Sequence, residues 1–317
     1  MKIIFMGTPD FAIPSLKKIL QSHHKILAVV TAPDKERGRG RQISSTPVKE
    51  FAIKEGLEVL TPISLKEPSF IQHLKELNPD LFIVVAFRIL PKEVYSIPEK
   101  GSFNLHGSLL PKYRGAAPIQ WAIINGERET GVTTFYLEDK VDTGNIIIQE
   151  KLEINDDDDF ELLHDKMMQL GADVILKTLD LIETGKVVLK KQKDSDATPA
   201  PKITKDICRI NWNKTTLEIY NLIRGLSPYP AAFFINNDNI FKIFKTKIPE
   251  KEKLPVIKSQ ISDNSFIANI FIQTKNEIYV RTSDGILQIL ELQPEGRKRM
   301  TAEEFLRGNT LIRLPCR

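Results

Sequence analysis

The chain has 317 residues, of which 27% are charged and 41% hydrophobic, a balance typical of a soluble globular protein with about two domains. No apolar run approaches the roughly 18–20 residues of a membrane-spanning helix, and the N-terminal IIFM is followed too soon by Gly, Pro and Asp to be a signal sequence. The two cysteines, Cys208 and Cys316, have neither metal-ligand nor disulfide-framework spacing, so the composition predicts a cytoplasmic enzyme or binding protein.

The N-terminal half alternates short apolar runs, typical of strands in a sheet covered on both faces, with stretches of helical period. The predicted strands are 2–6, 25–31, 80–86, 131–138 and 145–154, and the predicted helices are 11–22, 46–56, 64–77 and 155–185. The acidic start of the last helix suits the positive end of its dipole. This order predicts an α/β fold with a Rossmann-like, mostly parallel sheet.

The character of the sequence changes after Gly185, where a polar, proline-bearing stretch without apolar period follows. We therefore predict a first domain at 1–189, a linker at 190–206 and a second domain at 207–317. The second domain begins with one amphipathic helix and continues with short runs of strand character separated by turn residues, which favours a small OB-like β-barrel. The predicted helix is 213–226, and the predicted strands are 231–236, 239–246, 265–273, 277–282 and 285–293.

The net charge of +4 is distributed unevenly along the chain. Residues 1–190 carry 24 Lys and Arg against 27 Asp and Glu, a net of −3, whereas residues 207–317 carry 17 against 11, a net of +6. A basic second domain indicates an anionic partner, although ordinary surface lysines explain the same count.

Three familiar kinds of site are excluded by their own requirements. Only Gly7 is present where a dinucleotide-binding turn needs three glycines. Asp142-Thr143-Gly144 occurs once, whereas an aspartic protease needs two carboxylates that share a proton. Ser108 lacks the glycine two residues further on that a nucleophile elbow requires.

Asn104, His106 and Asp142 form a more promising set. Residues i and i+2 of a strand point the same way, so Asn104 and His106 project side by side from the end of SFNLH, at the edge of the sheet where ligands bind. An amide donates to a developing oxyanion, an imidazole moves a proton, and a carboxylate beside the imidazole favours its charged form. Spacing alone leaves open that His106 is a structural histidine after a strand.

The segment NLHGSLLPKYRGAAPIQWAI, followed by ETGVTTF and VDTGNII, closely resembles the folate-dependent formyltransferase family. The resemblance implies that Asn104, His106 and Asp142 are the catalytic trio and that 10-formyltetrahydrofolate is the co-substrate. It also implies that the Ser-Leu-Leu-Pro turn contacts the folate, and the turn comprises Ser108, Leu109, Leu110 and Pro111. The role of His106 as base, acid or oxyanion donor stays open.

Other stretches resemble the branch of this family that formylates initiator methionyl-tRNA, and the resemblance covers nearly the whole chain. The basic RGRGR sequence lies where that branch has a loop that reaches the acceptor end of the tRNA, and IRGLSPYPAAFF and GRKRM match its C-terminal part. The implied tRNA-binding residues are Arg37, Arg39, Arg41, Arg224, Lys298 and Arg299. A flexible, solvated loop tip is the plainer explanation of RGRGR.

One stretch departs from that branch. Its members commonly have Ala-Tyr-Gly before Ile-Leu-Pro, whereas this chain has a turn that resembles the members acting on glycinamide ribonucleotide. The turn comprises Phe87, Arg88, Ile89 and Leu90, whose main chain is expected to contact the folate.

A formyltransferase that acts on an amino sugar-nucleotide is the main alternative. We expect a monomer without a metal requirement and without membrane contact.

Overall fold

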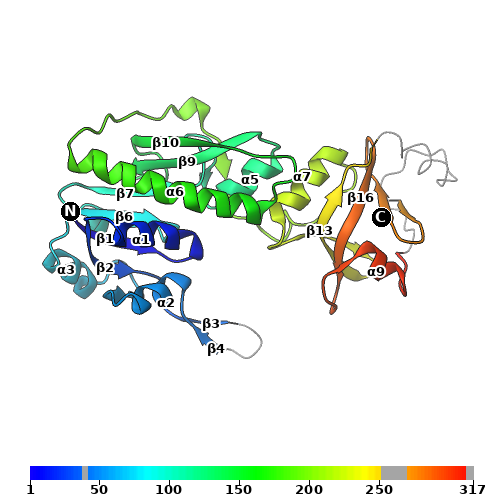
Figure 1. Ribbon diagram of the computed structural model, residues 1–317, viewed down its shortest axis with the longest axis horizontal. Coiled ribbons are helices and arrows are strands. Elements are labelled where there is room, and N and C mark those ends of the chain that lie inside the picture. The colour runs from blue at the N-terminus through cyan, green and yellow to red at the C-terminus, as the bar shows by residue number, and fades with distance from the viewer. Residues whose placement is uncertain (38–41, 251–269, 312–317) are drawn as a thin grey trace. The chain divides into compact units, whose positions relative to one another are not determined.

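The computed structural model describes residues 1–37, 42–250 and 270–311, and the chain divides into two compact units (Figure 1). The first unit comprises Met1–Pro118, Glu129–Glu153 and His164–Pro201. The second comprises Ile119–Arg128, Ile154–Leu163 and Lys202–Arg317. This division differs from the single cut at a linker that the sequence indicated, because two short segments of the first half pack with the C-terminal part.

The first unit is built on a seven-stranded sheet in the order β10-β9-β7-β6-β1-β2-β5. Its strands are β1 (Lys2–Gly7), β2 (Lys25–Val30), β5 (Val59–Leu60), β6 (Leu81–Val85), β7 (Ser102–His106), β9 (Glu129–Tyr136) and β10 (Ile146–Glu153). The five strands from β5 to β7 run parallel, and β9 and β10 add antiparallel neighbours. The predicted α/β fold with a mostly parallel sheet is confirmed.

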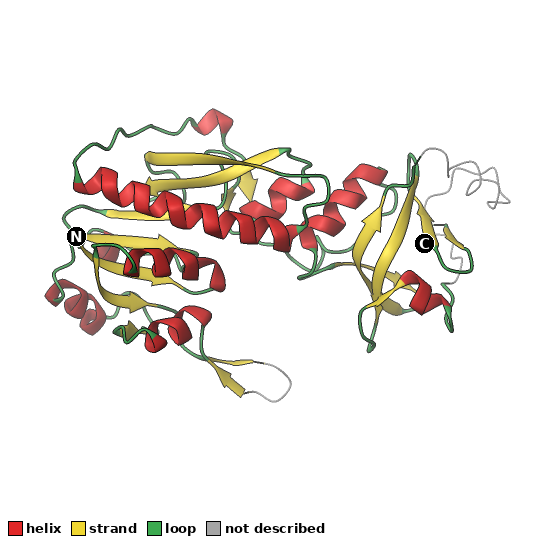
Figure 2. Cartoon of the chain, in the orientation of Figure 1, coloured by secondary structure: helices red, strands yellow, loops and turns green. Residues whose placement is uncertain are grey.

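Helices accompany the strands of this sheet, as the cartoon in Figure 2 shows. They are α1 (Ile13–Leu20), α2 (Pro47–Lys54), α3 (Pro68–Glu76), α4 (Lys92–Tyr95) and α6 (Phe160–Glu183). The helix α5 (Pro118–Ile124), which precedes β9 in the chain, belongs to the second unit from Ile119 onward. The central strands are buried on both faces: Ile3, Ile4 and Phe5 have no exposed surface. Continuous apolar runs therefore became strands in the middle of the sheet.

The long helix α6 packs closely against the strand that carries the predicted site. A Cβ on Gly171 would lie 2.6 Å from a methyl carbon of Leu105, so glycine lets the helix approach β7. The hydroxyls of Thr134 and Thr178 lie 2.8 Å apart and join α6 to β9 where water is excluded. These contacts fix β7 and β9 relative to each other.

The C-terminal part begins with α7 (Thr216–Leu226), whose N-terminus is closed by a capping box between Thr215 and Glu218. An antiparallel sheet follows in the order β12-β13-β16-β15-β14, with β17 paired to β16. Its strands are β12 (Ala232–Asn236), β13 (Asn239–Lys247), β14 (Phe271–Gln273), β15 (Ile278–Arg281), β16 (Ile286–Pro294) and β17 (Met300–Thr301), before α9 (Ala302–Leu306). The predicted small OB-like β domain is confirmed as an antiparallel half-barrel sheet, while residues 265–269 of one predicted strand lie outside the described residues.

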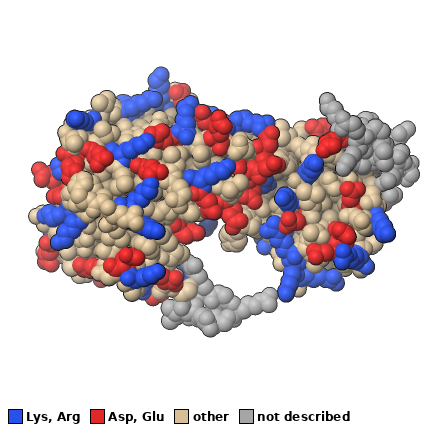
Figure 3. All heavy atoms as spheres, in the orientation of Figure 1, with Lys and Arg blue, Asp and Glu red and all other residues tan. Residues whose placement is uncertain are grey.

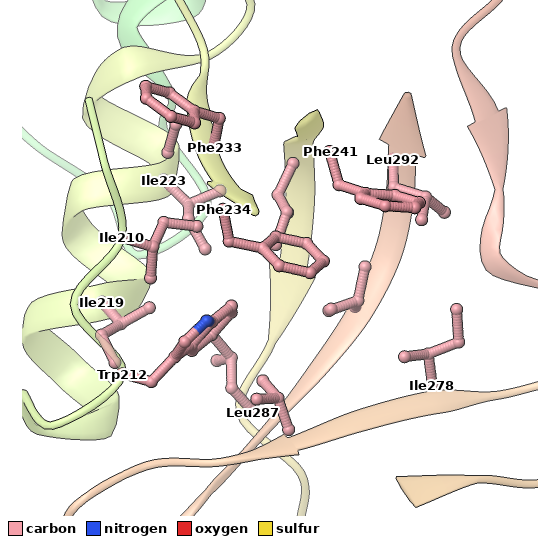
Figure 4. Close-up of a cluster of buried hydrophobic side chains, with 14 of the residues drawn as sticks. Ile210, Trp212, Ile219, Ile223, Phe233, Phe234, Phe241, Ile278, Leu287 and Leu292 are labelled. Atoms are coloured by element: carbon pink, nitrogen blue, oxygen red, sulfur yellow. The ribbon is translucent and has the colours of Figure 1, made fainter. Parts of the chain in front are cut away.

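An aromatic cluster forms the core of this second unit (Figure 4). Trp212 meets the rings of Phe234 and Phe271 edge-on at centroid distances of 5.6 and 5.7 Å. Phe234 in turn stacks on Phe241 at 5.3 Å. The sheet and α7 thus enclose one apolar core, as expected for an independent folding unit.

The start of the predicted linker is part of the first unit. Lys190 pairs with Ile146 by main-chain hydrogen bonds, and β11 (Pro199–Ala200) pairs in parallel with β8 (Arg114–Gly115). Polar composition suggested a free connection, but main-chain pairing does not depend on apolar side chains, which is why the sequence did not reveal it.

Candidate active site

Asn104 and His106 lie at the carboxyl end of β7 in the middle of the sheet. Asn104 is paired with Val84 on the parallel side and with Phe135 on the antiparallel side, which places the two side chains of the i, i+2 pair on one face. Asn104 is half-buried and His106 is 6% exposed. The strand thus presents an amide and an imidazole side by side at the edge formed by the carboxyl ends of the parallel strands.

The ring of His106 is held by two contacts. Its Nε2 lies 2.8 Å from the main-chain oxygen of Tyr113, and its ring is T-shaped to that of Phe135 at a centroid distance of 6.4 Å. A carbonyl oxygen can only accept a hydrogen bond, so the neutral imidazole carries its proton on Nε2. The lone pair of the neutral ring is therefore on Nδ1, which lies 3.9 Å from Oδ2 of Asp142.

Asp142 comes from the connection between β9 and β10 and is 9% exposed. Its Oδ2 also accepts a hydrogen bond of 2.9 Å from the main-chain N–H of Gly115. Its φ of 56° lies in the left-handed region, which aspartate tolerates better than most residues. Gly144 closes the same turn, since a Cβ there would lie 1.7 Å from the main-chain oxygen of Tyr136. The single Asp-Thr-Gly is therefore a tight turn that delivers one carboxylate to His106.

The Ser-Leu-Leu-Pro turn is fixed by its own hydrogen bonds. Ser108 is fully buried and its hydroxyl donates to the main-chain oxygen of Lys112 at 2.6 Å. Thr133 donates to the main-chain oxygen of Ser108 and accepts from the N–H of Leu110. Gln149 donates to the main-chain oxygen of Leu110 at 2.7 Å. Ser108 thus shapes the turn, and Leu109 and Pro111 remain partly accessible.

A cavity of about 610 Å³ lies at the turn that departs from the expected sequence. It is lined by Ile63, Ser64, Leu65, Lys66, Arg88, Ile89, Leu90, Pro91, Lys92, Tyr95 and Asp139. Three predicted folate residues, Arg88, Ile89 and Leu90, therefore share one cavity, and its volume is typical of a small-molecule site. The guanidinium of Arg88 donates to the main-chain oxygens of Pro62 and Ile63 at 2.9 and 3.0 Å, which joins two walls of the cavity.

A hydroxyl and a carboxylate at this cavity are hydrogen-bonded. The hydroxyl of Tyr95 donates to Asp139 at 2.5 Å, which raises the pKa of Tyr95 to about 12 and lowers the pKa of Asp139. Asp139 belongs to the same β9–β10 connection as Asp142, so this bond joins the connection to α4.

The predicted tRNA-binding residues are distributed between the two units. Arg37 ends β3 (Lys35–Arg37), which pairs with β4 (Gln42–Ser44) as a hairpin, while Arg39 and Arg41 lie outside the described residues. Lys298 and Arg299 are exposed in the second unit. Figure 3 shows Lys and Arg gathered along the lower part of that unit among Asp and Glu side chains.

Arg224 is held by neighbours within the protein. Arg224 is 9% exposed, and its Nη1 donates to the main-chain oxygens of Asn155 and Asp158 at 3.1 and 2.9 Å. Its Nε donates to Asn221 at 2.9 Å, and burial lowers its pKa. These carbonyls precede α6, so the Arg224 guanidinium is engaged by main-chain acceptors within the second unit, and its expected contact with tRNA stays a prediction.

One group of side chains in the described part of the chain, His23, His24 and Glu183, has the spacing of metal ligands. It lies where β2 begins, at the opposite edge of the parallel strands from His106, and His23 Nε2 is 2.8 Å from Glu183. It therefore contributes nothing to the trio. The expectation of no metal requirement stays a prediction.

Several groups that position His106 and Asp142 were not identified from the sequence. Tyr113 and Gly115 act through main-chain atoms, which no residue type announces. Gln192 contacts the Asp142 turn from a segment far away in the sequence, and Arg114 in turn contacts Gln192. Only the polar, non-periodic character around Gln192 was visible beforehand.

An amide, an imidazole and a carboxylate at the carboxyl edge of an α/β sheet are the groups that acyl transfer uses. The sequence model of the formyl transferase family matches residues 1–179, and that of the formyl transferase C-terminal domain matches residues 202–310. The chain therefore belongs to the formyl transferase family, which confirms the resemblance found in its motifs.

Similar proteins cover the chain over nearly its whole length. A methionyl-tRNA formyltransferase of Caldanaerobacter subterraneus subsp. tengcongensis is 45% identical over 98% of this chain and 98% of its own. One of Flavobacterium psychrophilum is 48% identical over 98% and 96%. The solved structure of an N-formyltransferase from Helicobacter canadensis, in complex with folinic acid and dTDP-3-aminofucose, is 25% identical, with a TM-score of 0.64 over 91% of this chain and 98% of that one.

No helix in the described ranges is both long and apolar enough to cross a membrane.

Proposed function

We propose that this protein transfers the formyl group of 10-formyltetrahydrofolate to the α-amino group of methionine esterified to initiator tRNA. The observation that carries the proposal is the 3.9 Å separation of His106 Nδ1 from Asp142 Oδ2, at the strand end that also presents Asn104. The full-length relatives at 45 and 48% identity support methionyl-tRNA as the acceptor.

The chemistry forms one C–N bond and breaks another. The neutral amine attacks the formyl carbon, and negative charge develops on the formyl oxygen. The amide N–H₂ of Asn104 stabilises this oxyanion, as preorganised donors do in acyl transfer. The proton leaves the amine as the C–N bond to the folate nitrogen breaks, and that nitrogen receives a proton.

His106 accepts the proton on Nδ1 and then delivers one to the leaving nitrogen. Nδ1 has this role because Nε2 is committed to the main-chain oxygen of Tyr113. The imidazolium that forms is stabilised by the carboxylate of Asp142, which the N–H of Gly115 orients.

The cavity beside Arg88 suits a folate. Ile63, Ile89 and Leu90 supply apolar walls for a flat ring, and the basic side chains of Lys66 and Lys92 suit the carboxylates of its tail. We also assign the main chain of Leu109 to Pro111 to the co-substrate site, on the resemblance of that turn to the family.

The tRNA contacts are assigned to the basic RGRGR sequence and to Lys298 and Arg299 of the second unit. Arg37, Arg39 and Arg41 supply guanidinium forks for phosphates, and the excess of positive charge after residue 207 supplies longer-range attraction. We further propose that the protein acts in the cytoplasm as a monomer and without a metal ion.

The test is the destination of a labelled formyl group. The protein is incubated with labelled 10-formyltetrahydrofolate and either methionyl-tRNA, a dTDP-amino sugar or water alone. We expect label on the methionine of the tRNA. Label recovered only on the sugar, or only as formate, contradicts the proposal and identifies an amino sugar formyltransferase or a hydrolase instead.

A further inference from the structure

We propose that Gln192 is a positioning residue that clamps the turn of Asp142 and thereby sets its distance from His106. Gln192 belongs to the segment after α6 that the sequence indicated as a linker. The inference rests on the proposed role of Asp142 and extends it to the groups that hold this carboxylate.

Every hydrogen-bonding group of the Gln192 amide is used. Nε2 donates to the main-chain oxygens of Asp142 and Gly144 at 2.9 and 2.8 Å. Oε1 accepts from Nε and Nη2 of Arg114 at 3.1 and 2.9 Å. The side chain is 7% exposed, so little water competes for these contacts. An amide has two donor hydrogens and two acceptor lone pairs, and the clamp occupies all four.

The turn needs an external anchor. Asp142 has a φ of 56°, which is a disfavoured conformation for a residue with a side chain. The preceding Val141 is 50% exposed, so packing holds the turn weakly on that side. Gln192 binds the carbonyls on both sides of Thr143, and this fixes the main chain through the residue that carries the carboxylate.

The clamp and the carboxylate share one further segment. Arg114 orients Gln192 through its guanidinium, and the next residue, Gly115, donates its N–H to Oδ2 of Asp142. The main chain and the side chain of Asp142 are thus both tied to β8. Loss of the Gln192 donors removes the hydrogen bonds to the main chain of the turn, so the Asp142 carboxylate can shift. Displacement of a catalytic group by about 1 Å costs on the order of a hundredfold in rate.

The test begins with Gln192→Glu, which keeps the size and the acceptor for Arg114 but turns an oxygen toward the two carbonyls. Gln192→Met makes the same loss of donors without adding a charge. We expect both variants to lower kcat about 10- to 100-fold at saturating substrates, with each KM within about threefold of the wild type, since binding groups are untouched.

Gln273→Glu is the matched control. Gln273 likewise donates from Nε2 to a main-chain oxygen, that of Leu311 at 2.7 Å, but it lies in the second unit. This variant should lower the melting temperature and leave kcat within about twofold, which separates a lost structural hydrogen bond from a lost clamp.

The deciding measurement is single-turnover formylation by Gln192→Glu in an Asp142→Asn background. If Gln192 acts through Asp142, adding Gln192→Glu to the Asp142→Asn variant lowers its rate by less than about threefold. The two substitutions then disable the same catalytic group, so their effects are not additive. Equal fold losses in both backgrounds, or wild-type kcat in Gln192→Glu and Gln192→Met, overturn the proposal.

Hydrogen exchange keeps this inference separate from the proposed function. The amides of residues 142–145 should exchange faster in Gln192→Met than in the wild type, whatever acceptor the enzyme uses. Unchanged exchange refutes the clamp. Faster exchange in a protein that does not formylate methionyl-tRNA leaves the clamp standing and refutes the proposed function.

Discussion

Substitution of Asp142 by Asn removes one negative charge from the site and little else. Asparagine has the same shape, and its Oδ1 can still accept the hydrogen bond from the N–H of Gly115. The turn and its left-handed φ are also compatible with asparagine. The rate change therefore reports mainly the electrostatic effect of the carboxylate on His106.

The magnitude follows from the distance between the charged groups. Two unit charges separated by 3.9 Å, as Nδ1 of His106 and Oδ2 of Asp142 are, attract each other by about 4 kcal/mol at an effective dielectric constant of about 20. If His106 carries a full positive charge in the transition state, the loss of this energy lowers the rate by about a thousandfold. Partial charge on the ring brings the expected loss to about a hundredfold.

The assay is single-turnover formylation of methionyl-tRNA with the enzyme and the folate in excess. Glu58→Gln is the control, since it removes a carboxylate 2.7 Å from Nε2 of His73 at an exposed pair in the same unit. The control should keep its rate within about twofold. An Asp142→Asn rate within tenfold of the wild type would refute the assignment of a charge-stabilising role.

Three further predictions concern the turn, the second core and pH. Gly144→Ala places a Cβ 1.7 Å from the main-chain oxygen of Tyr136, so kcat should fall more than about a hundredfold; near-normal kcat would contradict the steric argument. Trp212→Ala should cost about 3–5 kcal/mol in the free energy of unfolding of the second unit, measured with urea, because the side chain is 5% exposed and packs against two phenylalanine rings. Burial, the nearby N-terminal amine and His23 lower the pKa of His24 from 6.5, so the unfolded state binds the proton more tightly and stability should fall as the pH drops below about 6.5. The free energy of unfolding by urea should change less between pH 7.5 and 5.5 in His24→Gln than in the wild type. An equal change in both proteins would refute the assignment of this pH dependence to His24.

The fold was predictable where the side-chain pattern carries the information. The buried apolar runs became the parallel strands β1, β2 and β6 because both faces of those strands are covered. Asn104 and His106 were identifiable as neighbours because a strand repeats every two residues. Their partner, Asp142, follows from the resemblance to a family, since no local rule joins residues 36 positions apart.

The rest depended on contacts that residue types do not announce. Arg224 was named as a tRNA-binding residue because IRGLSPYPAAFF resembles the branch acting on methionyl-tRNA, whereas the sequence did not show that its donors meet the main-chain oxygens of Asn155 and Asp158. Gln192 lies in a polar stretch that gives no sign of burial. In each case the deciding partner is a main-chain atom from a distant segment, which becomes identifiable only after folding.

The most direct test of the central claim is the single-turnover rate at which His106→Ala forms formyl-methionyl-tRNA, compared with the wild type. The account predicts a loss of about two to four orders of magnitude, the range for a missing proton carrier, with unchanged folding and tRNA affinity. A variant that keeps more than about a tenth of the wild-type rate would contradict the mechanism, because Nδ1 of His106 would then not carry the proton.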